Sequence, residues 1–165
     1  VVPELSDEII CQGLAGFTGL PHRLKFVAEK RGVKFYDDSI STTPGSAVAT
    51  LRSFQQPKVM ILGGADKGGD YTELAEELAH SSSLRGVIVS GGNADDIAKA
   101  LQKAGLPDAT IVQKGMIPMT EVVQCALDIA QPGDVIILSP AAASFDQYAN
   151  YTARGEAFVE AVAGI

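Results

Sequence analysis

The sequence predicts an α/β fold in which a mostly parallel sheet is covered by helices on both faces. Short, continuously apolar strands alternate with amphipathic helices along most of the chain, and strands of this kind are buried on both sides. Glycine and hydroxyl residues follow several of these strands. Near the N-terminus, the basic turn 30–32 joins two strands directly, which predicts an antiparallel hairpin at one edge of the sheet.

Local patterns place each element along the chain. Ser6 followed by an acidic turn predicts a helix over 6–14, and Pro44 at a first helical position predicts one that continues to residue 54. The hairpin strands are expected at 24–29 and 33–38. Further strands are expected at 58–62, 86–90, 110–113 and 134–138, and further helices from about 71 to 80 and at 94–104, 118–130 and 152–162. The 165 residues are enough for one domain of ordinary size.

Composition excludes several classes of function. The formal charge of −7 argues against a nucleic-acid surface, and no apolar run approaches the ~20 residues that span a bilayer. Cys11 and Cys125 each lie within an apolar helical pattern, so we expect small, buried or half-buried side chains in a reduced, cytoplasmic setting rather than a disulfide or a metal site.

The candidate site is expected in the loops that follow the strands, because ligands of parallel sheets bind outside the carboxyl ends of the strands. These loops span 38–42, 63–70, 90–92 and 139–146. In the last one, small residues and Ser144 lead from a strand toward an expected helix start, a pattern typical of anion pockets built on backbone N–H groups. The four loops together predict a small anionic ligand and no metal site.

Lys67 and Ser144 have plain alternatives to a functional role. The loop 63–69 lacks the P-loop spacing, since Lys67 is followed by glycine; it fits a binding loop and a flexible surface turn equally well. A lysine in such a loop can reach a ligand carboxylate. No histidine follows Ser144 and the hydrolase elbow is missing, so a hydrogen-bonding role is expected rather than a nucleophile.

Asp37 and Asp38 do not form a catalytic pair in this interpretation, because neighbours on a strand point to opposite faces. Asp38, beside the loop, is the better candidate for a ligand contact; its alternative role is to cap the helix after Thr43. Arg23 precedes the first strand, where a lone arginine is usually a surface charge.

Several segments occur together in the order and spacing of a known family. They are Gly-Leu-Pro-His-Arg at 19–23, Tyr-Asp-Asp-Ser at 36–39 with Thr42, Gly-Gly at 63–64 with Lys67, and Leu-Ser-Pro-Ala-Ala-Ala-Ser-Phe-Asp-Gln-Tyr at 138–148 with Arg154, Gly155 and Phe158. Nearly the whole chain resembles the C-terminal domain of the Mur ligases of bacterial peptidoglycan synthesis, in particular of members that add D-glutamate to UDP-N-acetylmuramoyl-L-alanine.

The resemblance implies a Rossmann-like, three-layer domain of a three-domain, ATP-dependent ligase that works through an acyl phosphate. It implies that residues 1–18 are a helix and hinge segment from the preceding central domain, and that this domain holds most of the ATP and Mg²⁺. By the same resemblance, the D-glutamate pocket is lined by Thr42, Lys67, Ser144, Phe145 and Tyr151, and the ATP is reached by Arg23 and Asp38. No complete catalytic apparatus and no metal site is expected within the chain alone, which is therefore expected to be inactive.

One departure from the family's pattern leaves alternatives open. Many members have Asp-Ser-Lys-Ala-Thr-Asn where this chain has Asp-Ser-Ile-Ser-Thr-Thr at 38–43, so Ile40 replaces a lysine. A Mur-type ligase that adds another amino acid is the first alternative. The second is a non-catalytic binding module for a small anion. The start at Val1, without a methionine, favours an enzyme fragment over that module.

Overall fold

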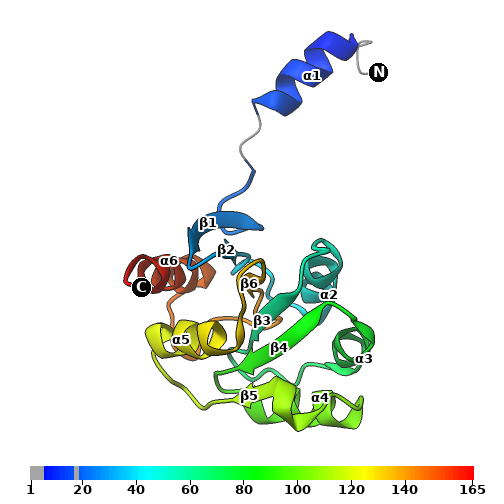
Figure 1. The fold of residues 1–165 in the computed structure, drawn as a ribbon, viewed down its shortest axis with the longest axis vertical. Helices are drawn as coiled ribbons and strands as arrows, with labels where there is room; N and C mark the ends of the chain where they lie inside the picture. Colours follow the sequence, from blue (N-terminus) through cyan, green and yellow to red (C-terminus); the bar gives the residue numbers. More distant parts are fainter. Residues whose placement is uncertain (1–5, 17–18) are drawn as a thin grey trace.

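The computed structural model describes residues 6–16 and 19–165. It contains one six-stranded sheet with helices packed on both of its faces (Figure 1). The strands lie in the order β1-β2-β6-β3-β4-β5, and only β1 runs antiparallel to its neighbour. The strands are β1 (Lys25–Lys30), β2 (Val33–Asp37), β3 (Lys58–Leu62), β4 (Leu84–Val89), β5 (Ile111–Gln113) and β6 (Val135–Leu138). The predicted mostly parallel sheet with an antiparallel hairpin edge is confirmed.

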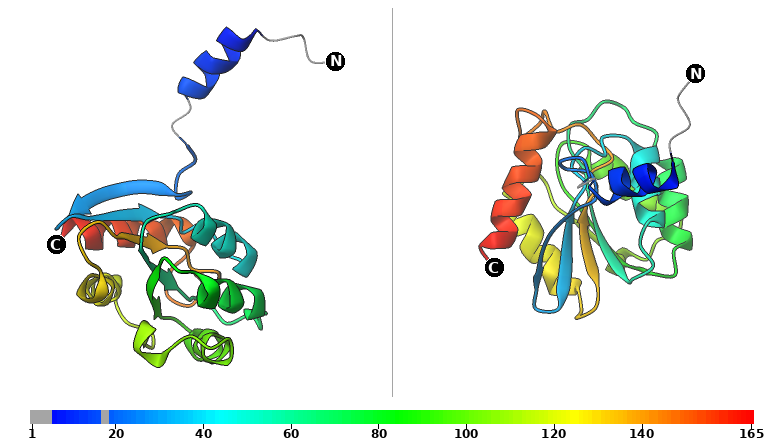
Figure 2. Two further views of the ribbon diagram at one scale, coloured as in Figure 1. Left: turned by 45° about the vertical axis from the view of Figure 1, so that its right-hand side comes forward. Right: turned by 90° about the horizontal axis from the view of Figure 1, so that it is seen from above.

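Helices α2 to α6 form two layers, one on each face of this sheet. They are α2 (Pro44–Arg52), α3 (Thr72–His80), α4 (Ala94–Lys103), α5 (Met119–Ile129) and α6 (Tyr151–Ala163). Helix α1 (Asp7–Ala15) lies away from both layers (Figure 1). In the view from above, α5 and α6 lie on one side of the sheet and α2 to α4 on the other (Figure 2). Among the described residues, no residue of α1 is buried.

The two faces of the sheet have separate apolar cores, because successive strand residues point to opposite sides. Met60 and Leu62 of β3 pack with α2, α3 and α4. Val59 and Ile61, which alternate with them, pack with α5 and α6. All five residues of β3 are buried, as expected for a central parallel strand covered on both faces.

The helix expected at 152–162 is α6, and a turn separates its first residue, Tyr151, from Ser144. One local expectation was wrong. Cys11 is exposed rather than half-buried, because no described residue of α1 is buried against the cores, whereas Cys125 of α5 is half-buried as expected. No helix among the described residues is long and apolar enough to cross a membrane.

The strand order decides where the loops meet. β6 is the last strand in the chain, yet it lies between β2 and β3. The loop that leaves β6 therefore emerges between the loops that leave β2 and β3. A point at which the strand order reverses in this way is where open α/β sheets bind ligands.

Candidate functional site

Backbone hydrogen bonds tie the loop after β6 to both neighbouring loops. The Ala141 N–H donates to the Ser41 carbonyl at 2.9 Å, which connects it to the loop after β2. The Gly63 and Ala65 N–H groups donate to the carbonyls of Pro140 and Ala143, each at 2.8 Å. Ala141 has a φ of 59°, a conformation that costs a non-glycine residue about 1–2 kcal/mol. The three loops thus hold one another in a single shape.

A cavity of about 220 Å³ opens between these loops. It is lined by Thr42, Thr43, Pro44, Ala65, Lys67, Gly69, Tyr71 and Ala141–Ala143. Thr43 caps α2 through a reciprocal pair of bonds with Ser46, and Pro44 is the first residue of that helix. The positive end of the α2 dipole therefore lies at the cavity wall, on which Lys67 adds a full positive charge.

Lys67 is exposed and has one aromatic contact. Its Nζ atom lies 5.0 Å from the centroid of the Phe145 ring, which is itself 66 % exposed. A cation above an aromatic face at this distance is attracted by the ring. The structure therefore brings Lys67, Phe145 and Thr42, three of the residues predicted to bind the substrate, to one cavity and its rim.

The other two residues predicted to bind the substrate lie differently. Ser144 is buried, and its carbonyl accepts from the N–H groups of Gln147 and Tyr148, which closes the turn that follows β6. Tyr151 opens α6 beside His22, with the ring centroids 6.1 Å apart. Its carbonyl accepts from the Ser39 hydroxyl at 2.7 Å. Among the described residues, no hydrogen bond, ion pair or ring contact joins either of them to Lys67.

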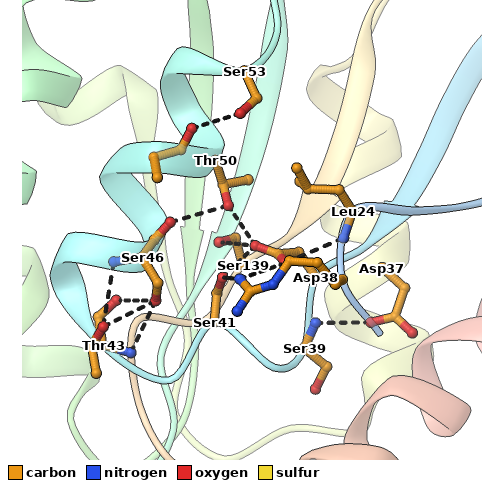
Figure 3. Close-up of polar contacts among 12 residues, drawn as sticks. Leu24, Asp37, Asp38, Ser39, Ser41, Thr43, Ser46, Thr50, Ser53 and Ser139 are labelled. Carbon is orange, nitrogen blue, oxygen red and sulfur yellow. Dashed lines mark hydrogen bonds and ion pairs between the residues drawn. The ribbon is translucent and has the colours of Figure 1, made fainter. Parts of the chain in front are cut away.

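Asp38 is completely buried at the centre of a hydrogen-bond network (Figure 3). Its carboxylate accepts from the Thr50 hydroxyl at 2.5 Å, the Ser139 hydroxyl at 3.1 Å, the Ser41 hydroxyl, the Leu24 N–H at 3.3 Å and Arg23 Nη1 at 3.3 Å. The alternative role as a helix cap is wrong, because Thr43 caps α2. The carboxylate instead joins β2 to α2, to the loop after β6 and to the segment that precedes β1.

Arg23 is the outward-facing member of this network. Its side chain is 42 % exposed, and Nη1 donates to the Ser41 hydroxyl at 2.9 Å as well as to Asp38. A guanidinium carries five N–H donors. One end of Arg23 is thus held by buried acceptors, while the exposed part is available to a ligand anion.

Asp37 points to the opposite face of the sheet from Asp38, as expected for neighbouring strand residues. Its Oδ2 lies 2.7 Å from His22 Nδ1, and its Oδ1 accepts from the Ser39 N–H at 2.9 Å. Gly155 of α6 approaches this pair so closely that an added Cβ would lie 2.7 Å from the Asp37 carboxylate. Glycine is required here because a side chain would displace the pair.

Arg154 is a site residue to which sequence reasoning gave no role. Its guanidinium is buried and donates to the Ser39 hydroxyl at 3.0 Å, the Ser39 carbonyl at 2.9 Å and the Ala142 carbonyl at 3.0 Å. Burial lowers the pKa of Arg154 to about 10, so it stays charged at neutral pH. Its position four residues before Phe158, on the buried face of a helix, was the available signal.

Residues 22–142 match the family model described as Mur ligase, glutamate ligase domain. The chain belongs to the Mur ligase family. It is 42 % identical, over 96 % of its length, to the UDP-N-acetylmuramoylalanine–D-glutamate ligase of Nitrosomonas europaea, and 39 % identical, over 95 %, to that of Geobacillus kaustophilus. It spans about a third of the length of these curated relatives, 32 % and 34 %.

Solved structures similar to this Mur ligase domain have the same fold. The chain covers 35 % of a bifunctional folylpolyglutamate synthase/dihydrofolate synthase from Yersinia pestis CO92, with a TM-score of 0.61 and 20 % identity over 98 % of its own length. It covers 33 % of a murein peptide ligase from Psychrobacter arcticus 273-4, with a TM-score of 0.58 and 13 % identity over 95 % of its own length. The Rossmann-like, three-layer architecture implied by the sequence resemblance is thereby confirmed.

Proposed function

We propose that this chain is the amino-acid-binding domain of an ATP-dependent ligase that adds D-glutamate to UDP-N-acetylmuramoyl-L-alanine in peptidoglycan synthesis. The observation that carries the proposal is the cavity between the loops after β2, β3 and β6, which Lys67 and Thr42 line. A cavity of about 220 Å³ lies below the roughly 300–1,000 Å³ of drug-sized sites. That size suits an amino acid rather than a whole nucleotide.

The electrostatics of the cavity fit a dicarboxylate. Lys67 supplies a cation at one wall, and the N-terminus of α2, with Thr42 beside it, supplies a partial positive charge and a hydroxyl group at another. Two carboxylates of one small ligand therefore have two separate partners. Phe145 beside Lys67 limits where the ammonium can move, which favours one orientation of the ligand.

Chemistry in such a ligase needs groups that this chain contributes only in part. A substrate carboxylate would be phosphorylated by ATP, and the amine of D-glutamate would then displace phosphate from the acyl phosphate to form the amide. Among the described residues, no three His, Cys, Asp or Glu side chains gather as a metal site. We therefore assign ATP and Mg²⁺ mainly to another domain of a longer protein, with the exposed part of Arg23 reaching the phosphates.

Asp38 acts in this proposal through Arg23 rather than by touching the nucleotide. Its carboxylate is completely buried and surrounded by donors from its own chain. The ion pair of Arg23 and Asp38 therefore holds the guanidinium at the edge of the sheet. Closure of the domain over the nucleotide would exclude water from the acyl phosphate. The proposed hinge at 16–23 includes residues 17–18, which lie outside the described residues.

An NMR titration of this chain tests the acceptor site directly. We expect D-glutamate to shift the amides around Thr42 and Lys67 and to bind more tightly than L-glutamate or D-aspartate. A preference for another amino acid would reassign the substrate, as Ile40 in place of the family's lysine allows. Binding of any small anion without preference would favour a non-catalytic module.

Lys67→Met tests the cation that carries the proposal. A charge-assisted bond contributes about 1.5–3 kcal/mol, so the affinity for D-glutamate should fall roughly 10- to 100-fold. Lys114→Met is the matched control, because Lys114 is another exposed lysine that follows a strand at the same edge of the sheet. Equal losses in the two variants would overturn the role of Lys67.

In a full-length ligase, Lys67→Met should raise the KM for D-glutamate more than that for ATP, and Arg23→Ala should do the reverse. The chain alone should form no amide.

A further inference from the structure

Asn93 occupies the cap position of α4 but does not cap that helix. Its side chain makes no bond to the first turn of α4, although an asparagine cap typically contributes about 1 kcal/mol. Instead the side chain, 1 % exposed, turns toward the glycine loop after β3. A residue that gives up a favourable local bond for a buried long-range one is expected to have a structural or functional reason.

Three hydrogen bonds join Asn93 to the two ends of one segment. Oδ1 accepts from the Gly64 N–H at 2.8 Å, and the Asn93 N–H donates to the Gly64 carbonyl at 3.0 Å. Nδ2 donates to the Tyr71 hydroxyl at 2.6 Å. The Gly64 amide can only donate, so it requires the side-chain oxygen of Asn93 and leaves the amide nitrogen for Tyr71. Asn93 therefore clamps both ends of the segment 64–71.

This segment carries Lys67 and is intrinsically flexible. It contains Gly64, Gly68 and Gly69, and Gly68 has a φ of 65°. Glycine loses more conformational freedom on folding than any other residue, so without an anchor the loop would sample many shapes. Tyr71 supplies a second anchor: its hydroxyl would lie 2.9 Å from a Cβ added at Gly69, so the chain passes directly over the phenol. Tyr71 also lines the cavity.

We propose that Asn93 is a positioning residue for the ligand: through Gly64 and Tyr71 it holds the loop that carries Lys67 in its ligand-binding shape. The identity of the ligand as D-glutamate rests on the proposed function above. The clamp itself rests on the three bonds and on the burial of Asn93. Asn93 touches no ligand in this proposal and acts on it only through Lys67.

A double-mutant cycle tests whether Asn93 acts through Lys67. The affinity for D-glutamate is measured by NMR titration for the unsubstituted chain, Asn93→Ala, Lys67→Met and the double variant. We expect Asn93→Ala to weaken binding about 10-fold alone and less than about 2-fold when Lys67 is already replaced. A merely structural role predicts losses that multiply in the double variant. That additive result would overturn the proposal.

Amide hydrogen exchange without ligand gives a second, independent readout. Exchange at 65–70 should accelerate in Asn93→Ala, and more weakly in Tyr71→Phe, which removes only one end of the clamp. The control is Lys58→Met, which replaces another buried polar side chain at the start of β3, away from these loops. Unchanged exchange in Asn93→Ala, or equal acceleration in the control, would overturn the clamp. If the unsubstituted chain binds no D-glutamate, the proposed function fails, and the exchange result alone decides the clamp.

Discussion

Asp38 and Lys67 lie in loops that leave the same edge of the sheet, after β2 and β3 on either side of β6, yet the protein holds them in opposite ways. Asp38 is completely buried and accepts hydrogen bonds from the segment that precedes β1, from α2 and from the loop after β6. Lys67 is exposed and contacts the ring of Phe145. We call the first region the locked half of the site, formed by the loops after β2 and β6, and the second the open half, formed by 64–71.

The difference in burial indicates different roles: Asp38 organises the loops of the site, and Lys67 is available to contact a ligand. A buried charge is tolerated only when its bonding capacity is satisfied within the protein, and such a group can then organise the loops around it. A ligand contact needs bonding capacity that the protein has not already used. The locked half therefore provides the shape of the site, and the open half provides its charge.

Gly63→Ala should have the largest effect on stability, because Gly63 lies between the end of β3 and the open half. Gly63 has a φ of 112°, and an added Cβ would lie 2.8 Å from the Ser90 carbonyl carbon. We expect a loss of about 4 kcal/mol or more in the free energy of unfolding, measured by urea denaturation. Gly68→Ala is the control: its φ of 65° is also positive, but no atom lies within 4 Å, so about 1 kcal/mol is expected. Equal losses would show that backbone conformation, not the close approach, sets the cost.

Arg154→Met should destabilise the locked half by about 3 kcal/mol, because the carbonyls of Ser39 and Ala142 lose buried donors. Urea denaturation measures the change. Arg52→Met, which replaces an exposed arginine, should leave the unfolding midpoint nearly unchanged. A small loss for Arg154→Met would mean that water replaces its bonds.

Asp38→Asn should cost about 2 kcal/mol of unfolding free energy, since the amide keeps one acceptor but turns two N–H groups toward existing donors. Lys67→Met, in the open half, should change the same free energy by less than about 0.5 kcal/mol, although it lowers the affinity for the ligand. The comparison between the two halves is contradicted if these two stability effects are alike.

Asp70 gives the smallest expected effect and tests the far end of the open half by pH. The Thr72 N–H bonds its carboxylate and lowers the pKa of Asp70 below the ordinary 3.8. Its contribution is therefore fully present above that pH and is lost as the pH falls through the folded value. Asp70→Asn keeps the acceptor and removes the charge. Its thermal midpoint should fall less than that of the unsubstituted chain between about pH 5 and about pH 3, and equal falls would assign the acid sensitivity to other groups.

Sequence reasoning identified the groups of the site more readily than their arrangement. The positions of Thr42 and Lys67 after strands were sufficient to expect them at one edge of the sheet, and the structure places them around one cavity. The role of Arg154 was missed because its partners, Ser39 and Ala142, belong to other elements. Asn93 directly precedes the helix expected at 94–104, and nothing local showed that its side chain faces Gly64. The ligand-binding roles of all the predicted site residues stay predictions.

By itself the sequence determined the elements, their order and the hairpin edge, because apolar periodicity, caps and turn residues act within a few positions of the chain. Only the tertiary structure decided that Asp38 is internally satisfied, that Arg154 joins two loops and that Asn93 clamps the Lys67 segment. These bonds join residues far apart in the chain, 101 positions for Ser139 and Asp38 and 115 for Arg154 and Ser39. Which distant partners meet depends on the strand order, and inserting β6 between β2 and β3 leaves no local trace in the sequence.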